Sequence, residues 1–191
     1  MNKSLEQRIE EAIREEILIV PYDPGWRQLF RDEADFLRAK LPKSLIERIE
    51  HFGSTAVPGL AAKPVIDLLV QVSSLEETRV QIVPILETEG YEYFWRTDRL
   101  PAYAWFIKRD SRGKRTHHLH MVEAESKLWE RLYFRDYLRE FPEEARRYAE
   151  LKQFLAEKYP NDRVAYTEGK SAMIESLTET ARHYYGNDVR G

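Results

Sequence analysis

A single carboxylate inside an apolar segment constrains this chain more than any other feature of its sequence. Asp67 lies within residues 65–70, which read Val-Ile-Asp-Leu-Leu-Val. Uniform hydrophobicity of this kind is typical of a strand that is buried on both faces. Burying a lone carboxylate there costs several kcal/mol unless a partner meets it. The sequence therefore predicts a metal ion, a cationic side chain or a set of backbone donors beside Asp67.

Composition places the chain among ordinary globular proteins. Its 191 residues, 42% hydrophobic and 33% charged, suit one domain with a proper core. The net charge of −3 does not indicate nucleic acid as a partner, although it leaves that alternative open, and any anion site must be local. The absence of cysteine excludes disulfides, thiol nucleophiles and thiolate metal sites. No apolar run approaches the roughly 20 residues of a membrane span and the first residues lack a signal-peptide core, so we expect a cytoplasmic protein without membrane contact.

Hydrophobic periodicity predicts an α+β fold, in which a mixed β-sheet is flanked by helices and followed by a helical segment. We expect strands at residues 48–52, 65–72, 91–95, 103–109 and 115–122, the last two joined as a hairpin across residues 110–113. We expect helices at residues 5–17, 24–41, 74–90, 127–140, 142–159 and 163–184.

These elements divide the chain into two parts. Residues 1–19 are expected to be a charged N-terminal helix, and residues 20–185 a single domain. Within that domain the sheet core spans about residues 45–123 and the helical tail residues 126–185.

Gly53 and Ser54 follow the first predicted strand in a tight turn. Glycine lets the backbone approach a phosphate without a Cβ clash, so the turn can offer N–H groups and a hydroxyl to such a group. A Gly-Ser pair alone is usually only a turn. Its weight comes from Asp67, thirteen positions after Ser54 on the next strand. We take Gly53, Ser54 and Asp67 as the candidate catalytic residues, with Thr55 beside them as a candidate phosphate ligand.

A histidine-rich strand supplies candidate metal ligands. In the sequence Thr-His-His-Leu-His at residues 116–120, His118 and His120 project to one face of the strand and His117 to the other. His-x-His on a strand is a recurrent ligand spacing, because neutral imidazoles bind zinc and other transition metals well. Asp67 would complete a site for a divalent ion, whether magnesium, manganese or zinc. His51 can join this site or simply make a structural hydrogen bond.

Four side chains are candidates for binding the phosphates or the base of a nucleotide. Lys63 is held extended by the proline after it, just before the Asp67 strand, where it can pair with Asp67 or with a phosphate. Arg115 belongs to a basic hairpin, which is usually a solvated turn but can face the site. Tyr166 and Lys170 share a helix face and can offer a ring for stacking and a cation for phosphate, although such a pair is more often a surface contact.

The Gly53-Ser54 turn and Asp67 resemble the signature of the DNA polymerase beta-type nucleotidyltransferase superfamily, which ends in Asp-apolar-Asp or Asp-apolar-Glu. In that superfamily the two acids and a third carboxylate from a later strand hold divalent metals that bridge the nucleotide phosphates. Position 69 here is leucine, so the second carboxylate of the pair is absent. The departure weakens the expectation of a two-metal centre.

Residues 50–67 as a whole resemble the hallmark of the GrpB family within that superfamily. The likeness spans about residues 20–177 and includes Pro-Tyr-Asp-Pro at 21–24 with Trp26, His-Leu-His at 118–120, Phe-Arg-Asp-Tyr-Leu at 134–138, residues 148–155, and Tyr166 with Lys170. It implies the nucleotidyltransferase fold with appended helices, and relatives that occur alone or fused to dephospho-CoA kinase. The superfamily motif carries over Gly53, Ser54 and Asp67; the family pattern adds His51, Lys63, His118, His120, Tyr166 and Lys170.

Three functional hypotheses follow. The first is a nucleotidyltransferase-like enzyme that uses a divalent metal to move a nucleoside monophosphate from a nucleoside triphosphate (NTP) to an acceptor that the sequence does not identify. The second is a non-catalytic nucleotide- or metal-binding module, whose second metal position was lost with the carboxylate. The third is a hydrolase or phosphotransferase that uses one ion with histidine ligands. A second acid near Asp67 would favour the first hypothesis over the second.

Overall fold

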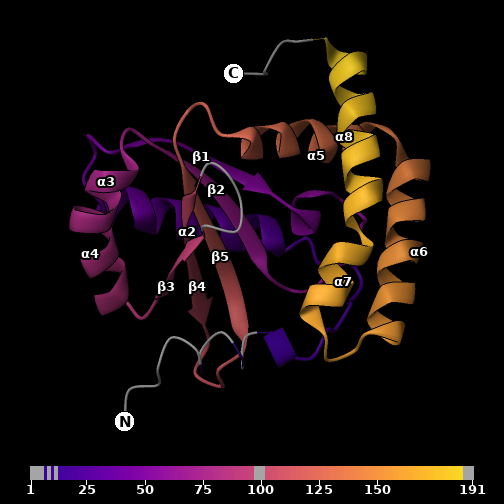
Figure 1. Cartoon of the computed structure of the whole chain (residues 1–191), viewed down its shortest axis with the longest axis horizontal. Coiled ribbons are helices and arrows are strands. Elements are labelled where there is room, and N and C mark those ends of the chain that lie inside the picture. Colours follow the sequence, from indigo (N-terminus) through magenta and orange to yellow (C-terminus); the bar gives the residue numbers. More distant parts are fainter. Residues whose placement is uncertain (1–6, 8–9, 11–12, 97–101, 187–191) are drawn as a thin grey trace.

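Five strands form one mixed sheet at the centre of the molecule (Figure 1). The computed structural model describes residues 7, 10, 13–96 and 102–186. The strands lie in the order β1–β2–β5–β4–β3; β2 and β5 are parallel, and the other neighbours are antiparallel. Their bounds are β1 (Ile46–Phe52), β2 (Ile66–Val72), β3 (Glu92–Arg96), β4 (Tyr103–Arg109) and β5 (Arg115–Val122). The predicted α+β fold is confirmed.

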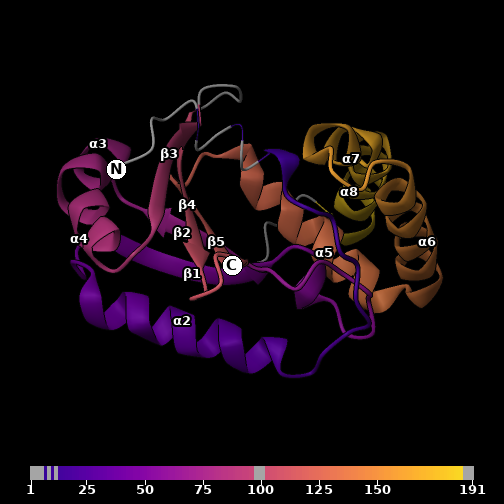
Figure 2. The same ribbon diagram turned by 90° about the horizontal axis from the view of Figure 1, so that it is seen from below.

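Helices surround this sheet on several sides. Figure 2 shows α2 along one face, with α3 and α4 at one end of the molecule and α6 to α8 at the other. The helices are α2 (Trp26–Lys40), α3 (Leu75–Glu77), α4 (Val83–Thr88), α5 (Arg131–Glu140), α6 (Pro142–Lys158), α7 (Arg163–Gly169) and α8 (Ser171–Tyr185), with the 3-10 turns η1 (Ser54–Ala56) and η3 (Lys127–Glu130) and the π-helical turn η2 (Thr78–Ile82). Among the described residues, no helix combines the length and the hydropathy that crossing a bilayer requires.

The two faces of β2 have different surroundings. Leu68 packs on the α2 face, in a core that also contains Leu119 of β5 and Leu37 of α2. Leu69 points to the opposite face, where it is buried with Phe52 and other apolar side chains. Both faces of β2 are therefore largely covered, as its uniform hydrophobicity predicts.

The parallel pairing of β2 with β5 places the chemically active side chains together. Asp67 pairs with His118, and Leu69 pairs with His120. Because paired residues on neighbouring strands point to the same face, Asp67, His118 and His120 share the face opposite α2. This juxtaposition of two strands about 50 residues apart in sequence fixes the position of the candidate site.

All five predicted strands are present within two residues of their expected bounds, and the β4–β5 hairpin is confirmed. Asp110 closes that hairpin, since its Oδ1 accepts hydrogen bonds from the backbone N–H groups of Arg112 and Lys114 at 2.9 Å each. Local turn chemistry of this kind is readable from sequence.

Three predicted helices are interrupted. The helix expected at residues 74–90 is divided by the π-helical turn η2, next to Pro84, which lacks the N–H needed for a regular helical ladder. The helix expected at residues 127–140 begins as the 3-10 turn η3. The helix expected at residues 163–184 is two helices that meet at Lys170. There Gly169 packs so closely on α6 that a Cβ atom would lie 2.6 Å from Leu155 Cδ2.

The helix expected at residues 5–17 ends before residue 17. Residues 5, 6, 8, 9, 11 and 12 lie outside the described residues; residues 7, 10, 13 and 14 are helical, and Glu15 is in a bend. Ile17 lies outside the helix, and its backbone N–H donates to the Pro160 carbonyl at 2.8 Å. Its side chain is buried against Leu155. The end of this N-terminal segment is therefore anchored on the helical tail.

Lys152 of α6 ties the helical tail to the loop that precedes β2. Its side chain is 2% exposed, and its ammonium group donates to the Ala61 carbonyl and lies 4.9 Å from the Tyr148 ring centroid. Burial, with a smaller effect from the charge of Lys170, lowers the pKa of Lys152 to about 7. The folded chain therefore holds this proton more weakly than the unfolded chain does.

Replacing Lys152 with methionine should remove part of the pH dependence of stability. Between pH 7 and the ordinary lysine pKa of 10.5, the unfolded wild type carries a proton that the folded state lacks, so raising the pH through this window stabilises the fold. The free energy of unfolding of the wild type should therefore rise relative to Lys152→Met across the window, as measured by denaturant titrations at several pH values. Lys158→Met, at an exposed position of the same helix, is the control and should show no such divergence. Parallel curves for the wild type and Lys152→Met would contradict the assignment.

Candidate functional site

The Gly53 turn lies directly against the Asp67 carboxylate. Gly53 has φ +74° and ψ −174°, a conformation that other residues rarely adopt. A Cβ atom at this position would overlap Asp67 Oδ2 and lie 3.0 Å from Asp67 Cγ. Glycine is thus required here both for its backbone conformation and for the space it leaves to the carboxylate.

His118 orients Asp67. Its Nδ1 is 3.0 Å from Asp67 Oδ1, and its Nε2 is 3.4 Å from Nη1 of Arg115. An arginine only donates hydrogen bonds, so Nε2 is the acceptor and Nδ1 carries the proton donated to Asp67. Burial lowers the pKa of His118, although the hydrogen bond to Asp67 opposes the shift. Burial alone would raise the pKa of Asp67, but the interaction with His118, led by its hydrogen bond, holds it below its ordinary value.

Asp67, His118 and His120 form one group of metal-ligating type. Their ligand atoms all lie within 4.8 Å of one another, and His120 Nε2 is 4.0 Å from Asp67 Oδ1. The Asp67 side chain is 27% exposed, so solvent reaches it. Imidazole and carboxylate donors together suit manganese or zinc better than magnesium, which prefers oxygen ligands. The donor set therefore fits one divalent ion, although the Nδ1 proton of His118 makes that residue an orienting partner first.

No further acid joins this group among the residues that the structure describes. Leu69, at the position of the second carboxylate of the superfamily signature, is fully buried with Phe52, Tyr103 and Trp129. The place where a second carboxylate would stand is thus part of the hydrophobic core. Within the described chain, these residues offer no second metal position of the paired-acid type.

Lys63 and Lys170 bring two positive charges to the same region. Their ammonium groups lie 5.1 and 4.2 Å from the ring centroid of Tyr166. Burial, and then repulsion between the two lysines and from Arg163, lowers the pKa of Lys63 well below its ordinary value. Burial lowers the pKa of Lys170 to about 8, although Asp67 opposes the shift. Cations crowded in this way are an unfavourable arrangement that a bound anion would relieve.

Tyr166 itself is not available for base stacking in this arrangement. Its side chain is only 1% exposed and packs with Ile17, Leu155 and Ala156. The ring serves as a platform for the two lysines instead. The helical spacing predicts that Tyr166 and Lys170 lie side by side, but it does not predict that the tyrosine is buried.

Ser54 has a partner that the sequence did not single out. The Tyr148 hydroxyl hydrogen-bonds the Ser54 side chain, while burial raises the pKa of Tyr148 to about 12. Tyr148 therefore lies beside the hydroxyl at the start of η1. The only sequence signal for it was its place in residues 148–155 of the family pattern.

His51 and Thr55 are not part of the group formed by Asp67, His118 and His120. His51 is buried on the α2 face, stacked on Phe30 with ring centroids 4.7 Å apart. Its Nε2 is 3.0 Å from Thr55 Oγ1, and that hydroxyl donates to the Val65 carbonyl at 3.3 Å. Burial lowers the pKa of His51 to about 4, so the ring is neutral. In the structure His51 makes the structural hydrogen bond, and the Thr55 hydroxyl is used within the fold.

Arg115 is likewise engaged within the protein. Its side chain is 5% exposed, and its Nε is 2.7 Å from Oε2 of Glu15. Glu15 also contacts Arg109 and Arg163, at 2.6 and 3.2 Å. Sequence reasoning missed Glu15 and Arg163, because nothing local in either segment indicates this long-range contact.

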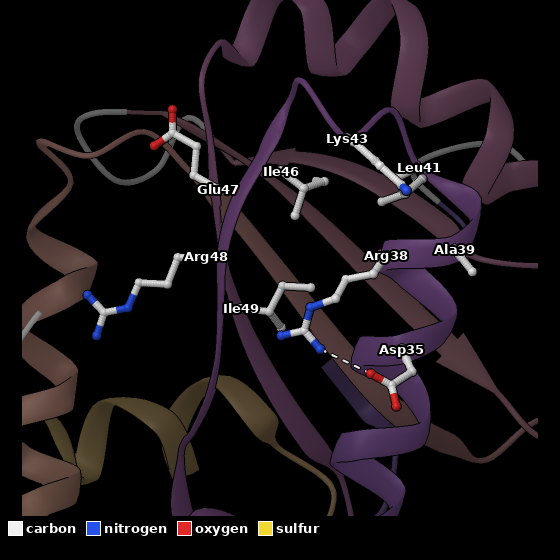
Figure 3. A pocket seen from close by; sticks show the side chains of 9 residues that line it. All are labelled: Asp35, Arg38, Ala39, Leu41, Lys43, Ile46, Glu47, Arg48 and Ile49. Carbon is white, nitrogen blue, oxygen red and sulfur yellow. Dashed lines mark hydrogen bonds and ion pairs between the residues drawn. The ribbon is translucent and has the colours of Figure 1, made fainter.

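A surface groove of about 600 Å³ lies elsewhere, between the end of α2 and the start of β1 (Figure 3). Arg38 and Asp35 pair at 3.1 Å on the α2 side of it, and Ile46 and Ile49 of β1 also line it. It contains none of the residues of the Asp67 region. The groove therefore does not change the location of the candidate site.

Gly53→Ala should destabilise the protein more than Gly113→Ala, a substitution at another glycine of positive φ. Gly113 has φ +78° and open space around it, so Gly113→Ala meets only the backbone penalty of about 1–2 kcal/mol. Gly53→Ala adds the clash with Asp67, which we expect to cost about another 1–3 kcal/mol. Chemical denaturation measures both variants. In an Asp67→Ala background, the extra destabilisation of Gly53→Ala over Gly113→Ala should become smaller. If this extra destabilisation is unchanged, the carboxylate is not its cause.

Comparisons with known proteins agree with this architecture. The sequence model of the family described as GrpB protein matches residues 16–180. UPF0157 protein PA4798 of Pseudomonas aeruginosa is 41% identical over 174 residues, which are 90% of this chain and 70% of that protein. Glutamate-rich protein GrpB of Alkalihalophilus pseudofirmus is 36% identical over 165 residues, covering 85% of this chain and 94% of that protein.

Solved structures give the same result for the fold. The crystal structure of conserved protein GrpB from Enterococcus faecalis superposes with a TM-score of 0.79 at 35% identity, covering 88% of this chain and 99% of that one. The Cid1 poly(U) polymerase with Mg 3'-dATP bound matches with a TM-score of 0.53 at 18% identity, over 79% of this chain and 49% of that one. At that identity the second likeness concerns the fold alone. This chain belongs to the GrpB family, and its sheet and surrounding helices have the nucleotidyltransferase-like fold.

Proposed function

We propose that this protein binds a nucleoside triphosphate together with one divalent metal ion at Asp67, and transfers the nucleoside monophosphate to an acceptor. The observation that carries the proposal is the crowding of Lys63 and Lys170 beside a lone carboxylate that abuts the Gly53 turn. A triphosphate would supply negative charge to balance the two crowded lysines. The metal ion would make that charge tolerable beside Asp67.

The chain's own residues have distinct roles in this proposal. Gly53 and Ser54 offer backbone N–H groups and a hydroxyl to the phosphates, and Lys63 and Lys170 offset phosphate charge. Asp67 and His120 would hold the ion, while His118 fixes the carboxylate through its Nδ1 proton. When bound there, a divalent ion would supply charge neutralisation of the phosphates and Lewis-acid polarisation. In the transfer, an acceptor hydroxyl oxygen would bond to the α-phosphorus and lose its proton to water, while the bond between the α-phosphorus and the bridging oxygen breaks and pyrophosphate leaves.

The fold likeness supports a nucleotide as the ligand class. Cid1 has been solved with Mg 3'-dATP and with its short product ApU, on a sheet of the same architecture. This chain spans only 43–49% of those proteins, so the transfer to RNA that the word polymerase implies is not carried over to it. The acceptor in our proposal is therefore any group with a nucleophilic oxygen.

Two other functions each have one observation in their favour. The burial of Leu69 favours a non-catalytic nucleotide-binding module, because a paired-acid, two-metal centre has no place to form. The histidine donors favour a hydrolase or phosphotransferase with a single ion. Both alternatives use the same ligand contacts as nucleotidyl transfer. Binding measurements therefore do not distinguish the three functions, whereas analysis of the reaction products does.

Nucleoside triphosphate with Mn²⁺ should stabilise the wild type, and Asp67→Asn should abolish the shift. At a ligand concentration of about 100 times Kd the stabilisation is about 2.7 kcal/mol, which thermal unfolding detects easily. Asp35→Asn, on α2 in the groove away from the site, is the matched control and should keep the full shift. A shift that needs no divalent ion and survives in Asp67→Asn would contradict the metal-centred proposal. Binding as expected, but without pyrophosphate release for any acceptor tested, would favour the non-catalytic module.

A further inference from the structure

Three arginines converge on one carboxylate at the edge of the candidate site. Glu15 Oε2 lies 2.7 Å from Arg115 Nε and 3.2 Å from Arg163 Nη2, and Oε1 lies 2.6 Å from Arg109 Nη2. Arg109 has a second partner, since its Nε is 2.8 Å from Glu92. Glu15 is thus the carboxylate that Arg115 and Arg163 share. Positive charge exceeds negative charge in this cluster.

The cluster joins three parts of the chain that are far apart in sequence. Arg115 begins β5, Arg163 begins α7, and Glu15 belongs to the N-terminal segment. Figure 1 shows the indigo N-terminal segment between α7 and the adjacent ends of β4 and β5, and Figure 2 agrees. The Glu15 side chain is 25% exposed, whereas those of Arg115 and Arg163 are 5% and 13% exposed. A carboxylate that solvent can reach therefore covers two arginines that solvent barely reaches.

This cluster is continuous with the candidate site. Arg115 donates to His118, which donates to Asp67, so Glu15 is connected to the candidate metal ligand through two side chains. Lys63 lies near the same cluster, because the charges of Arg163 and Arg115 add to the lowering of its pKa, which burial mainly causes. A phosphate chain that begins at Gly53 and passes Lys63 would reach these arginines next.

We propose that Arg115 and Arg163 form a phosphate subsite, for the end of the triphosphate that leaves as pyrophosphate, and that Glu15 closes this subsite when no ligand is bound. The proposal rests on the proposed function for the identity of the ligand. A terminal phosphate carries more negative charge and more acceptor oxygens than a carboxylate, and the planar guanidinium groups suit it. The Glu15 carboxylate acts as an internal substitute for that phosphate.

Displacing Glu15 does not require the fold to open. The chain just after it stays anchored through the Ile17 N–H bond to Pro160 and the bridge between Val20 and Ala62. The carboxylate can therefore leave the arginines while the segment that follows keeps its place. In this way the N-terminal segment sets how tightly the phosphates bind.

Glu15→Gln should bind inorganic triphosphate more tightly than the wild type, because glutamine keeps the size of the side chain but not its charge. Isothermal titration calorimetry in the presence of Mn²⁺, which the proposed function requires, should show a gain of about tenfold, equivalent to about 1.4 kcal/mol. Glu10→Gln is the matched control: Glu10 belongs to the same segment and pairs with Arg14 one turn away, at 2.9 Å, and its loss should leave the affinity unchanged. An affinity of Glu15→Gln no higher than that of Glu10→Gln would overturn the proposal, as would no binding to either.

A second variant keeps the test decisive if Glu15→Gln does not fold. Arg163→Gln removes half of the subsite and leaves the Arg115–Glu15 pair, so it should weaken triphosphate binding about tenfold. Unchanged binding by Arg163→Gln would overturn the subsite. Asp67→Asn separates this inference from the proposed function. If Asp67→Asn abolishes metal-dependent NTP binding while the Glu15 and Arg163 variants change nothing, only the subsite is wrong.

Discussion

The contact between the Gly53 turn and the Asp67 carboxylate is the constraint on which the rest of this site depends. A carboxylate on a central strand must be met by polar partners, and here the turn has no side chain that would push it away. His118 holds one oxygen, and two lysines stand nearby. Because the residues of β2 around Asp67 are apolar, the charged and polar partners of Asp67 all lie at this one point of the core. This point is where we place the ligand.

The centre of the site was predictable from sequence because its signals are local. Alternation along a strand put His118 and His120 on one face, and the turn residues placed Gly53 beside the next strand. The face that His51 takes could not be predicted, because it depends on which side of β1 is covered by α2. Other features could not be predicted because they arise from packing between distant segments. These are the burial of Tyr166, the hydrogen bond from Lys152 to the loop before β2, and the contacts of Glu15. Pro84 and Gly169 interrupted helices whose periodicity alone predicted continuity.

Because of Leu69, this chain has the nucleotidyltransferase-like fold without the pair of acids that holds two metal ions in the superfamily signature. The family relationship and the nucleotidyltransferase-like fold follow from sequence and structure together. The second acid of the superfamily signature, however, is replaced by a fully buried leucine. In our account one metal ion and two lysines take the place of a two-metal centre, with arginines beyond them for the far end of the phosphate chain. Function here is a property of these side chains rather than of the fold.

The central claim is that one divalent ion lies between Asp67 and the phosphates of a nucleotide. Pulsed electron paramagnetic resonance of the protein with Mn²⁺ and a nucleoside triphosphate tests it directly. The account predicts one bound Mn²⁺ per chain, with hyperfine couplings both to phosphorus of the nucleotide and to an imidazole nitrogen. His120→Ala should remove the nitrogen coupling and keep the phosphorus coupling. Two bound ions per chain, or a protein-bound ion without phosphorus coupling, would contradict the account.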